Sequence, residues 1–178
     1  ERWESLFTGF MAGKPVHRVI CTHMHPDHIG LAGWLCERFD CDLYMTQAEF
    51  LTGSLIMGYT GEAAPPPAIS FYHRTGFTDE QLKNYRARFG SFGQFATPLP
   101  HNYQRLSDRQ TLSIGGRYWQ VVVGQGHSPE HACLYCPALQ LVIAGDQILP
   151  RITPNVSVFP TEPDGNPLEE WLASSTRL

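Results

Sequence analysis

Four side chains that often bind metal ions lie within six consecutive residues of this 178-residue chain. His23, His25, Asp27 and His28 follow an apolar run at 16–22 that suits a buried strand, and they precede an amphipathic helical pattern. If the extended geometry of the strand continues, the His23 and His25 side chains point the same way, because they are two positions apart. Asp27 and His28 follow where the chain turns into the helix, so they can face a second position.

The density of this cluster favours a metal site over an incidental arrangement. Zinc-like ions take imidazole nitrogen at about 2.0 Å and carboxylate oxygen at a similar distance, and catalytic sites keep one position open for water. A plain helix start with Asp27 as its N-cap explains one residue and leaves three histidines unexplained. His17, His73 and His101 have no such neighbours, so we interpret them as ordinary polar residues.

The rest of the chain mixes predicted helices and strands. Apolar periodicity predicts helices at 3–10, 29–39 and 79–89, and a last helix that starts at Asn166-Pro167. Short apolar runs predict strands at 43–46, 111–114, 118–123, 132–136 and 140–144. Gly115-Gly116 marks a hairpin between two of these strands. Gly126-His127 and Gly145-Asp146 each follow a predicted strand, which places two more metal-ligand side chains at strand ends.

Residues 51–106 differ in character, because glycines and a Pro65-Pro66-Pro67 run separate weakly patterned segments. The segment is rich in aromatic residues. We consider two interpretations: an insertion that caps a substrate pocket, and an insertion whose rings only pack it onto the core.

The metal-type residues resemble a known signature. Residues 22–30, with the sequence THMHPDHIG, are similar to the H-x-H-x-D-H motif of the metallo-β-lactamase superfamily. Residues 126–131, GHSPEH, resemble its next histidine motif, and Gly145-Asp146 resembles its bridging aspartate. The resemblance implies an α/β fold, the αββα sandwich, with the metals at the edge where the two sheets meet.

The resemblance also implies a ligand set. By this analogy His23, His25 and His127 hold one metal, Asp27 and His28 hold a second, and Asp146 bridges the two. His131 matches no metal ligand of the family pattern. We expect it at most to support a ligand through an outer contact. Asp27 takes a further, catalytic role, in which it orients the nucleophile or receives its proton.

Two departures from the family pattern refine the expectation. Metallo-β-lactamases commonly carry a cysteine at the position of Asp146 and lack a histidine at that of His28, whereas this sequence resembles the glyoxalase II-like hydrolases. That branch has a further metal-binding histidine downstream and earlier strands, which do not occur between Glu1 and Leu178. We therefore expect residues 1–178 to form a single partial domain, truncated at both ends, with 51–106 as its candidate substrate cap.

The function implied by the resemblance is hydrolysis of a thioester or ester by a binuclear site, with two zinc ions as the expected cofactor. Iron and manganese accept the same ligands. One alternative is a mononuclear iron persulfide dioxygenase of the same fold, and others are hydrolases of β-lactams or nucleic acids. A structural relic is disfavoured, because a relic has no reason to keep Asp27, His28 and Asp146.

The composition disfavours nucleic acids and membranes as binding partners. The formal net charge of −4 gives no electrostatic footprint for nucleic acid, and no apolar run is long enough to cross a membrane. We expect a small-molecule thioester or ester as the partner, and the sequence leaves oligomerisation open. Five cysteines do not form a disulfide framework, which favours a reducing compartment, the cytoplasm. We interpret Cys133 and Cys136 as buried core residues rather than a redox or zinc pair.

Overall fold

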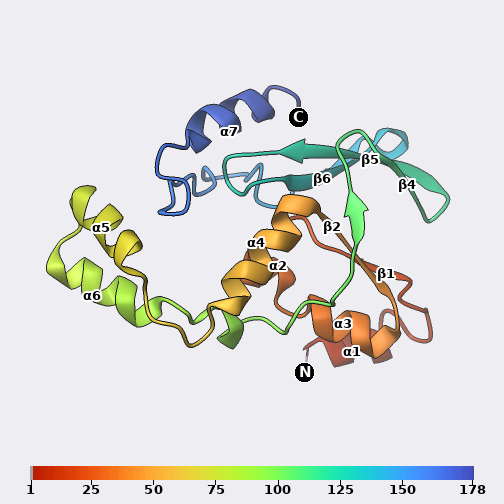
Figure 1. Cartoon of the computed structure of the whole chain (residues 1–178). Helices are drawn as coiled ribbons and strands as arrows, with labels where there is room; N and C mark the ends of the chain where they lie inside the picture. Colours follow the sequence, from red (N-terminus) through yellow and green to blue (C-terminus); the bar gives the residue numbers. More distant parts are fainter. Residues whose placement is uncertain (1) are drawn as a thin grey trace.

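Two sheets organise the molecule, which is seen in a computed structural model that describes residues 2–178. The first sheet is parallel, with the order β1 (Arg18–Ile20), β2 (Asp42–Thr46) and β3 (Gln104–Leu106). The second is an antiparallel meander of β4 (Thr111–Ile114), β5 (Arg117–Gly124), β6 (His131–Cys136) and β7 (Leu141–Ile143). Figure 1 shows both sheets and the helices that cover them.

The layers follow the order helix, sheet, sheet, helix. Helices α2 (Pro26–Ile29), α3 (Ala32–Phe39) and α4 (Gln47–Gly58) share one apolar cluster with Leu43 and Met45 of β2. A second apolar cluster fills the space between the sheets, where Ile20 and Tyr44 meet residues of β5 and β6. Helix α7 (Pro167–Ser175) packs against β5. This arrangement confirms the predicted α/β sandwich.

The alternation of side chains along β6 explains the cysteine pair. Ala132, Leu134 and Cys136 face the cluster between the sheets, whereas Cys133 lies outside that cluster. Both cysteines are fully buried, and all five cysteines of the chain are free. The interpretation of Cys133 and Cys136 as core residues is therefore confirmed.

The region around the histidine motif differs in detail from the prediction. The strand is three residues long instead of spanning 16–22, because only Arg18–Ile20 pair with β2. The predicted helix at 29–39 is interrupted at Gly30, whose carbonyl accepts a hydrogen bond of 2.7 Å from the backbone N–H of Thr97. The chain therefore forms the short helix α2, breaks, and continues as α3. Helix α3 ends as predicted at Asp40, which adopts a left-handed conformation with φ of 48°.

Most of residues 51–106 is helical, which corrects the weak patterning assigned to that range. Helix α4 extends into it, and α5 (Pro66–Arg74), α6 (Asp79–Arg88) and the short 3-10 helix η1 (Phe92–Gln94) follow. The proline run is the N-terminus of α5, since Pro65 is the N-cap and prolines fill the first helical positions. The capping box of α6 is confirmed: the Thr78 hydroxyl accepts from the backbone N–H of Gln81, and Gln81 Oε1 accepts from that of Thr78.

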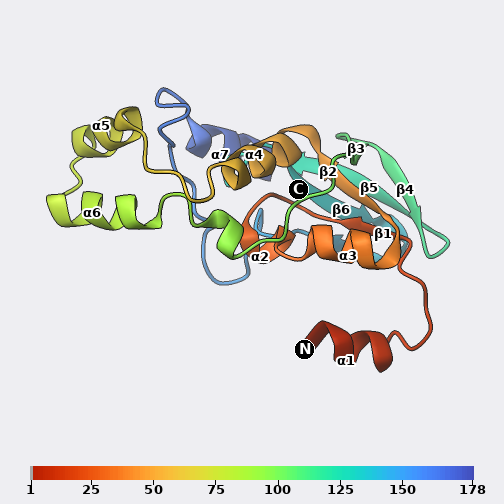
Figure 2. The ribbon, with the colours of Figure 1, turned by 60° about the horizontal axis from the view of Figure 1, so that its bottom comes forward.

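Within residues 51–106, α5 and α6 project from the sandwich, as the views in Figures 1 and 2 agree. The segment then returns to the parallel sheet as β3, whose Gln104 pairs with Tyr44 of β2. Helix α4 covers the sheet and contributes Phe50 to the core. The range that leaves the sandwich is therefore shorter than 51–106.

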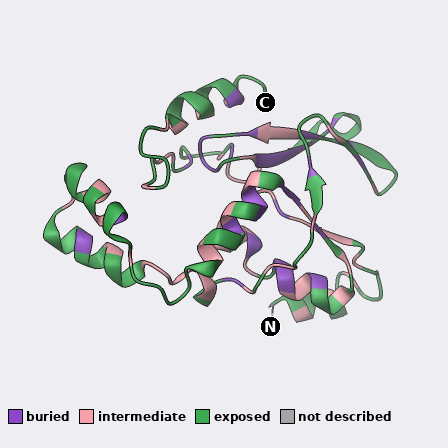
Figure 3. Cartoon of the chain, viewed as in Figure 1, coloured by how far each residue is buried: buried purple, intermediate pink, exposed green. Residues whose placement is uncertain are grey.

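Helix α1 (Arg2–Thr8) lies at the periphery and ends before the predicted Phe10. It contacts α3 through Phe7 and Phe39, whose rings are 4.9 Å apart, and through an ion pair of 2.7 Å between Glu4 and Arg38. Burial concentrates on β2 and β6 and on parts of α3 and α4 (Figure 3). Within residues 2–178, no helix is long and apolar enough to cross a membrane.

Candidate metal centre

The predicted ligands come together where the two sheets meet. His23, His25 and His28 lie in the connection from β1 through α2, His127 lies between β5 and β6, and Asp146 follows β7. A backbone hydrogen bond of 2.8 Å from Ala132 N–H to the carbonyl of Thr22 joins the sheets beside the site. The sandwich edge thus brings together side chains far apart in sequence.

Three imidazoles form a first convergent group, His23, His25 and His127. His127 Nε2 lies 3.3 Å from His23 Nε2 and 3.0 Å from His25 Nδ1. Nitrogens bound tetrahedrally to zinc at 2.0–2.1 Å are about 3.3 Å apart. The spacing of these nitrogens is compatible with one metal ion, and the three residues are those that the family resemblance assigns to the first metal.

A second convergent group contains His23, His28 and Asp146. Asp146 Oδ1 lies 3.3 Å from His28 Nε2, and Asp146 Oδ2 lies 3.8 Å from His127 Nε2. The Asp146 carboxylate therefore lies between the two groups, although the residue common to both is His23. Asp27 belongs to neither group; its Oδ2 lies 3.6 Å from His28 Nε2, and its side chain is 75% exposed.

His23 and His25 of the first group favour the neutral form that binds metals. Burial, together with the neighbouring imidazoles, lowers the pKa of His23. Burial, followed by the charge of His127, likewise lowers the pKa of His25. His127 Nδ1 donates a hydrogen bond of 2.8 Å to the carbonyl of Asn155, which makes Nε2 the ring nitrogen directed at the group.

His131 supports the site without joining either group. It is fully buried, its ring stacks on that of His23 at 4.6 Å, and burial is the main cause that lowers its pKa to about 3. His131 Nε2 accepts a hydrogen bond of 3.0 Å from the backbone N–H of Asp146. This hydrogen bond fixes the backbone of a predicted ligand, which agrees with the supporting role that we assigned to His131.

The sequence of the chain matches the model of the metallo-beta-lactamase superfamily over residues 10–178. This chain belongs to the metallo-beta-lactamase superfamily. It is 39% identical to a beta-lactamase domain protein from Burkholderia ambifaria, with a TM-score of 0.82, over 98% of this chain and 50% of that one. A metallo-beta-lactamase family protein from Thermus thermophilus is 28% identical, with a TM-score of 0.73, over 92% of this chain and 50% of that one.

An uncharacterized protein from Aquifex aeolicus (strain VF5) is 27% identical over 128 residues, which are 72% of this chain and 47% of that protein. The chain thus spans about half the length of the relatives that it matches.

In this member of the metallo-beta-lactamase superfamily, helix α7 supports two ligand loops from the side of the antiparallel sheet. Gln147, next to Asp146, donates hydrogen bonds of 3.1 Å from Nε2 to the carbonyl of Gln125 and to the hydroxyl of Ser174. Trp171 Nε1 donates to the carbonyl of Gln147 at 3.2 Å. Helix α7 therefore ties the loop before His127 to the loop that carries Asp146.

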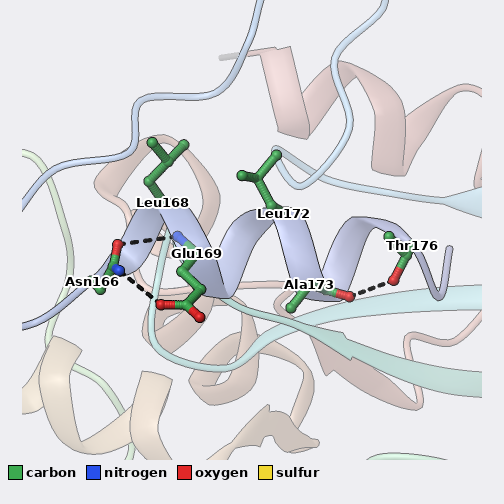
Figure 4. Close-up of a pocket in the computed structure, with 6 residues that line it drawn as sticks. All are labelled: Asn166, Leu168, Glu169, Leu172, Ala173 and Thr176. Carbon is green, nitrogen blue, oxygen red and sulfur yellow. Dashed lines mark hydrogen bonds between the residues drawn. The ribbon is translucent and has the colours of Figure 1, made fainter.

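A hollow on α7 is distinct from this centre (Figure 4). Leu168 and Leu172 point to the same side, and the Asn166 side chain caps the helix by accepting from the backbone N–H of Glu169 at 3.2 Å. That contact confirms the predicted helix start. The lining residues, Asn166, Leu168, Glu169, Leu172, Ala173 and Thr176, include none of the metallo-beta-lactamase ligands.

Sequence reasoning missed Glu49 altogether. This residue lies in the first turn of α4, is fully buried, and contacts two ligand loops. Burial raises the pKa of its carboxyl, and hydrogen bonds from the backbone N–H groups of Glu130 and Met24 oppose that shift. Only the packing of α4 onto the metallo-beta-lactamase sandwich distinguishes Glu49 from an ordinary helix glutamate, so the sequence carried no signal for it.

Proposed function

We propose that the protein to which this chain belongs is a binuclear metal-dependent hydrolase that cleaves a thioester or ester bond of a small molecule. The observation that carries the proposal is the pair of convergent groups at one sandwich edge, one of three histidines and one of His23, His28 and Asp146. Zinc is the metal that we propose, since imidazole and carboxylate donors at these spacings suit it.

The residues of such a site have separate roles. Metal ions bound there supply a water of lowered pKa and polarise the carbonyl under attack. His23, His25 and His127 hold the first position, and His28 and Asp146 contribute to the second. The exposed carboxylate of Asp27 is free to orient the attacking water or to accept its proton, in line with its 75% exposure beside His28.

The choice of a thioester or ester rests on the identity of two residues. The second group uses His28 and Asp146, the combination that resembles glyoxalase II-like hydrolases, where metallo-β-lactamases commonly have a cysteine in place of the aspartate. All five cysteines are free, which suits a reducing compartment, and we propose the cytoplasm.

A mononuclear iron enzyme that oxidises persulfides is the second candidate. The second group, His23, His28 and Asp146, offers two imidazoles and one carboxylate, the ligand set typical of non-haem iron oxygenases, and this is the observation that favours the iron enzyme. Metal analysis separates the two candidates: two zinc ions per chain support the hydrolase, whereas a single iron ion supports the oxidation.

The decisive experiment is the Asp146→Ala variant of the full-length protein. Loss of the carboxylate between the two groups should lower the metal content by about one ion per chain and reduce hydrolysis at least about a hundredfold, because the second position loses a ligand. Metal content is measured by elemental analysis, and activity with a panel of thioesters, lactones and β-lactams. Wild-type activity in the variant, with unchanged metal content, would contradict the assignment of Asp146.

A further inference from the structure

Glu49 joins two loops that carry metal ligands. Its Oε2 accepts a hydrogen bond of 2.9 Å from the backbone N–H of Met24, the residue between His23 and His25. Its Oε1 accepts one of 2.8 Å from the backbone N–H of Glu130, in the loop that follows His127. One fully buried carboxylate therefore holds backbone from both sheets.

Glu130 in turn accepts hydrogen bonds from the start of α4, the helix that carries Glu49. Its Oε2 accepts from the backbone N–H of Ala48 at 2.8 Å, and its carbonyl accepts from the Thr46 hydroxyl at 2.7 Å. Thr46 is the N-cap of α4 but makes no capping hydrogen bond with its side chain. The free N–H groups at the start of α4 are thus partly satisfied by a residue of another loop.

Helix capping alone does not require the hydrogen bonds that Glu49 and Glu130 make. A threonine N-cap satisfies the first turn of a helix by itself when its hydroxyl turns back towards the helix. Here the hydroxyl turns to Glu130, and a second carboxylate is buried, which costs free energy unless both of its oxygens are hydrogen-bonded. Both oxygens of Glu49 are satisfied, and each by the backbone of a different ligand loop.

We propose that Glu49 and Glu130 are positioning residues that set the spacing between the loop of His23 and His25 and the loop of His127. The separation of these loops determines whether the nitrogens of His25 and His127, now 3.0 Å apart, can share one ion. The inference deepens the proposed function and rests on its metal site. Neither glutamate is assigned as a ligand.

The test compares Glu49→Gln with wild type in the full-length protein, with Glu37→Gln on the exposed face of α3 as the matched control. The amide keeps the size of the side chain but places an NH2 group against one of the two backbone N–H donors. Two quantities are measured: hydrogen exchange of the Met24 and Glu130 amides in metal-free protein, and the affinity and visible spectrum of bound Co²⁺.

We expect both amides to exchange at least about tenfold faster in Glu49→Gln, Co²⁺ to bind about 10–100-fold more weakly, and its spectrum to change, because outer partners of metal ligands have effects of this size. Glu130→Ala should behave in the same way, and Glu130→Gln, which keeps an acceptor for Ala48, should recover most of the affinity. Folded variants with wild-type exchange, or with wild-type affinity and spectrum, would overturn the proposal, even if their melting temperature falls.

Failure of the proposed function gives a different result. Wild-type protein that binds no Co²⁺ would refute the metal site, whereas the exchange of the Met24 and Glu130 amides in metal-free protein would still decide whether Glu49 holds the two loops. If Glu49→Gln does not fold, the Glu130 pair of variants answers the same question, because Glu130 is only partly buried.

Discussion

Gly145 occupies a position where only a hydrogen atom fits. Its φ is +50°, and a Cβ at this residue would lie 2.6 Å from the His131 ring and 2.9 Å from the Thr22 hydroxyl. The next residue is Asp146, whose backbone N–H donates to His131. The close approach of backbone and imidazole therefore depends on the missing side chain.

Gly145→Ala should lower the free energy of unfolding by about 2 kcal/mol or more, from the left-handed backbone and the overpacking together. Gly115→Ala is the matched control: Gly115 has a similar φ of +58° and open space around it, so only the backbone cost, roughly 1 kcal/mol, applies. Denaturant unfolding measures both. Equal losses of unfolding free energy in the two variants would show that the contact with His131 does not affect stability.

The hydroxyl of Ser174 in helix α7 contacts both ligand loops. Ser174 Oγ accepts hydrogen bonds of 3.1 Å from the backbone N–H of Gln125 and from Gln147 Nε2. The neighbouring Ser175 hydroxyl is buried and has no hydrogen-bond partner among residues 2–178. Two adjacent serines of one helix thus differ in their hydrogen bonding.

We expect Ser174→Ala to destabilise the protein by about 1–3 kcal/mol, because buried donors lose their acceptor, and Ser175→Ala to change stability by less than about 0.5 kcal/mol. Thermal and denaturant unfolding of both variants provide the measurement. A neutral Ser174→Ala would show that the Ser174 hydroxyl does not contribute to holding α7 against the ligand loops.

A backbone hydrogen bond joins the two ends of the segment that contains helices α5 and α6. The backbone N–H of Gly61 donates to the carbonyl of Gly90 at 2.9 Å, so the two ends of the projecting segment meet. Contacts inside the pair are aromatic, with Tyr72 and Tyr85 ring centroids 4.6 Å apart. This closure defines the cut at which the proposed cap can be removed.

Deletion of residues 62–89, with Gly61 and Gly90 joined through one glycine, should leave metal content unchanged and alter the preference among substrates, since the predicted ligands lie outside the pair. Kinetics with the thioester, lactone and β-lactam panel and elemental analysis test this. Metal loss would assign the pair a structural role, and unchanged preference would refute the cap.

Sequence patterns predicted the elements whose signals are local. The capping box at Thr78, the glycine hairpin at Gly115-Gly116 and the spacing of His23 and His25 are each contained in a few residues. Helix α4 escaped prediction because it carries no clear polar face. The roles of Glu49 and Gly145 arise only from packing between the sheets, which no window of the sequence contains.

Acid sensitivity is a property of the whole molecule, because buried imidazoles collect where the sheets meet. The pKa values of His23, His25 and His131 are lowered, that of His131 to about 3. Between this pKa and the ordinary value near 6.5, the unfolded chain binds protons that the native protein does not bind. The stability of the metal-free protein is therefore fully present above about pH 6.5 and falls as the pH decreases.

Each such histidine contributes a slope of up to about 1.4 kcal/mol per pH unit. Urea unfolding of metal-free protein between about pH 7 and 4, most of which lies between the ordinary histidine pKa and that of folded His131, measures the sum. His131→Gln should flatten the profile, while His73→Gln on the exposed part of α5 should not. A pH-independent free energy of unfolding would show that the imidazoles are not buried as described.

The order of strands has a consequence for how the chain folds. The antiparallel sheet consists of neighbours in sequence, whereas the parallel sheet closes only when β3 returns to β2 after α4, α5 and α6. Local pairings form faster than distant ones, so we expect the meander to precede the parallel sheet. His23 and His25 belong to the slow half and His127 to the fast half. A metal that needs all three can bind only after the halves have met, so the time course of metal uptake during refolding follows the last stage of folding.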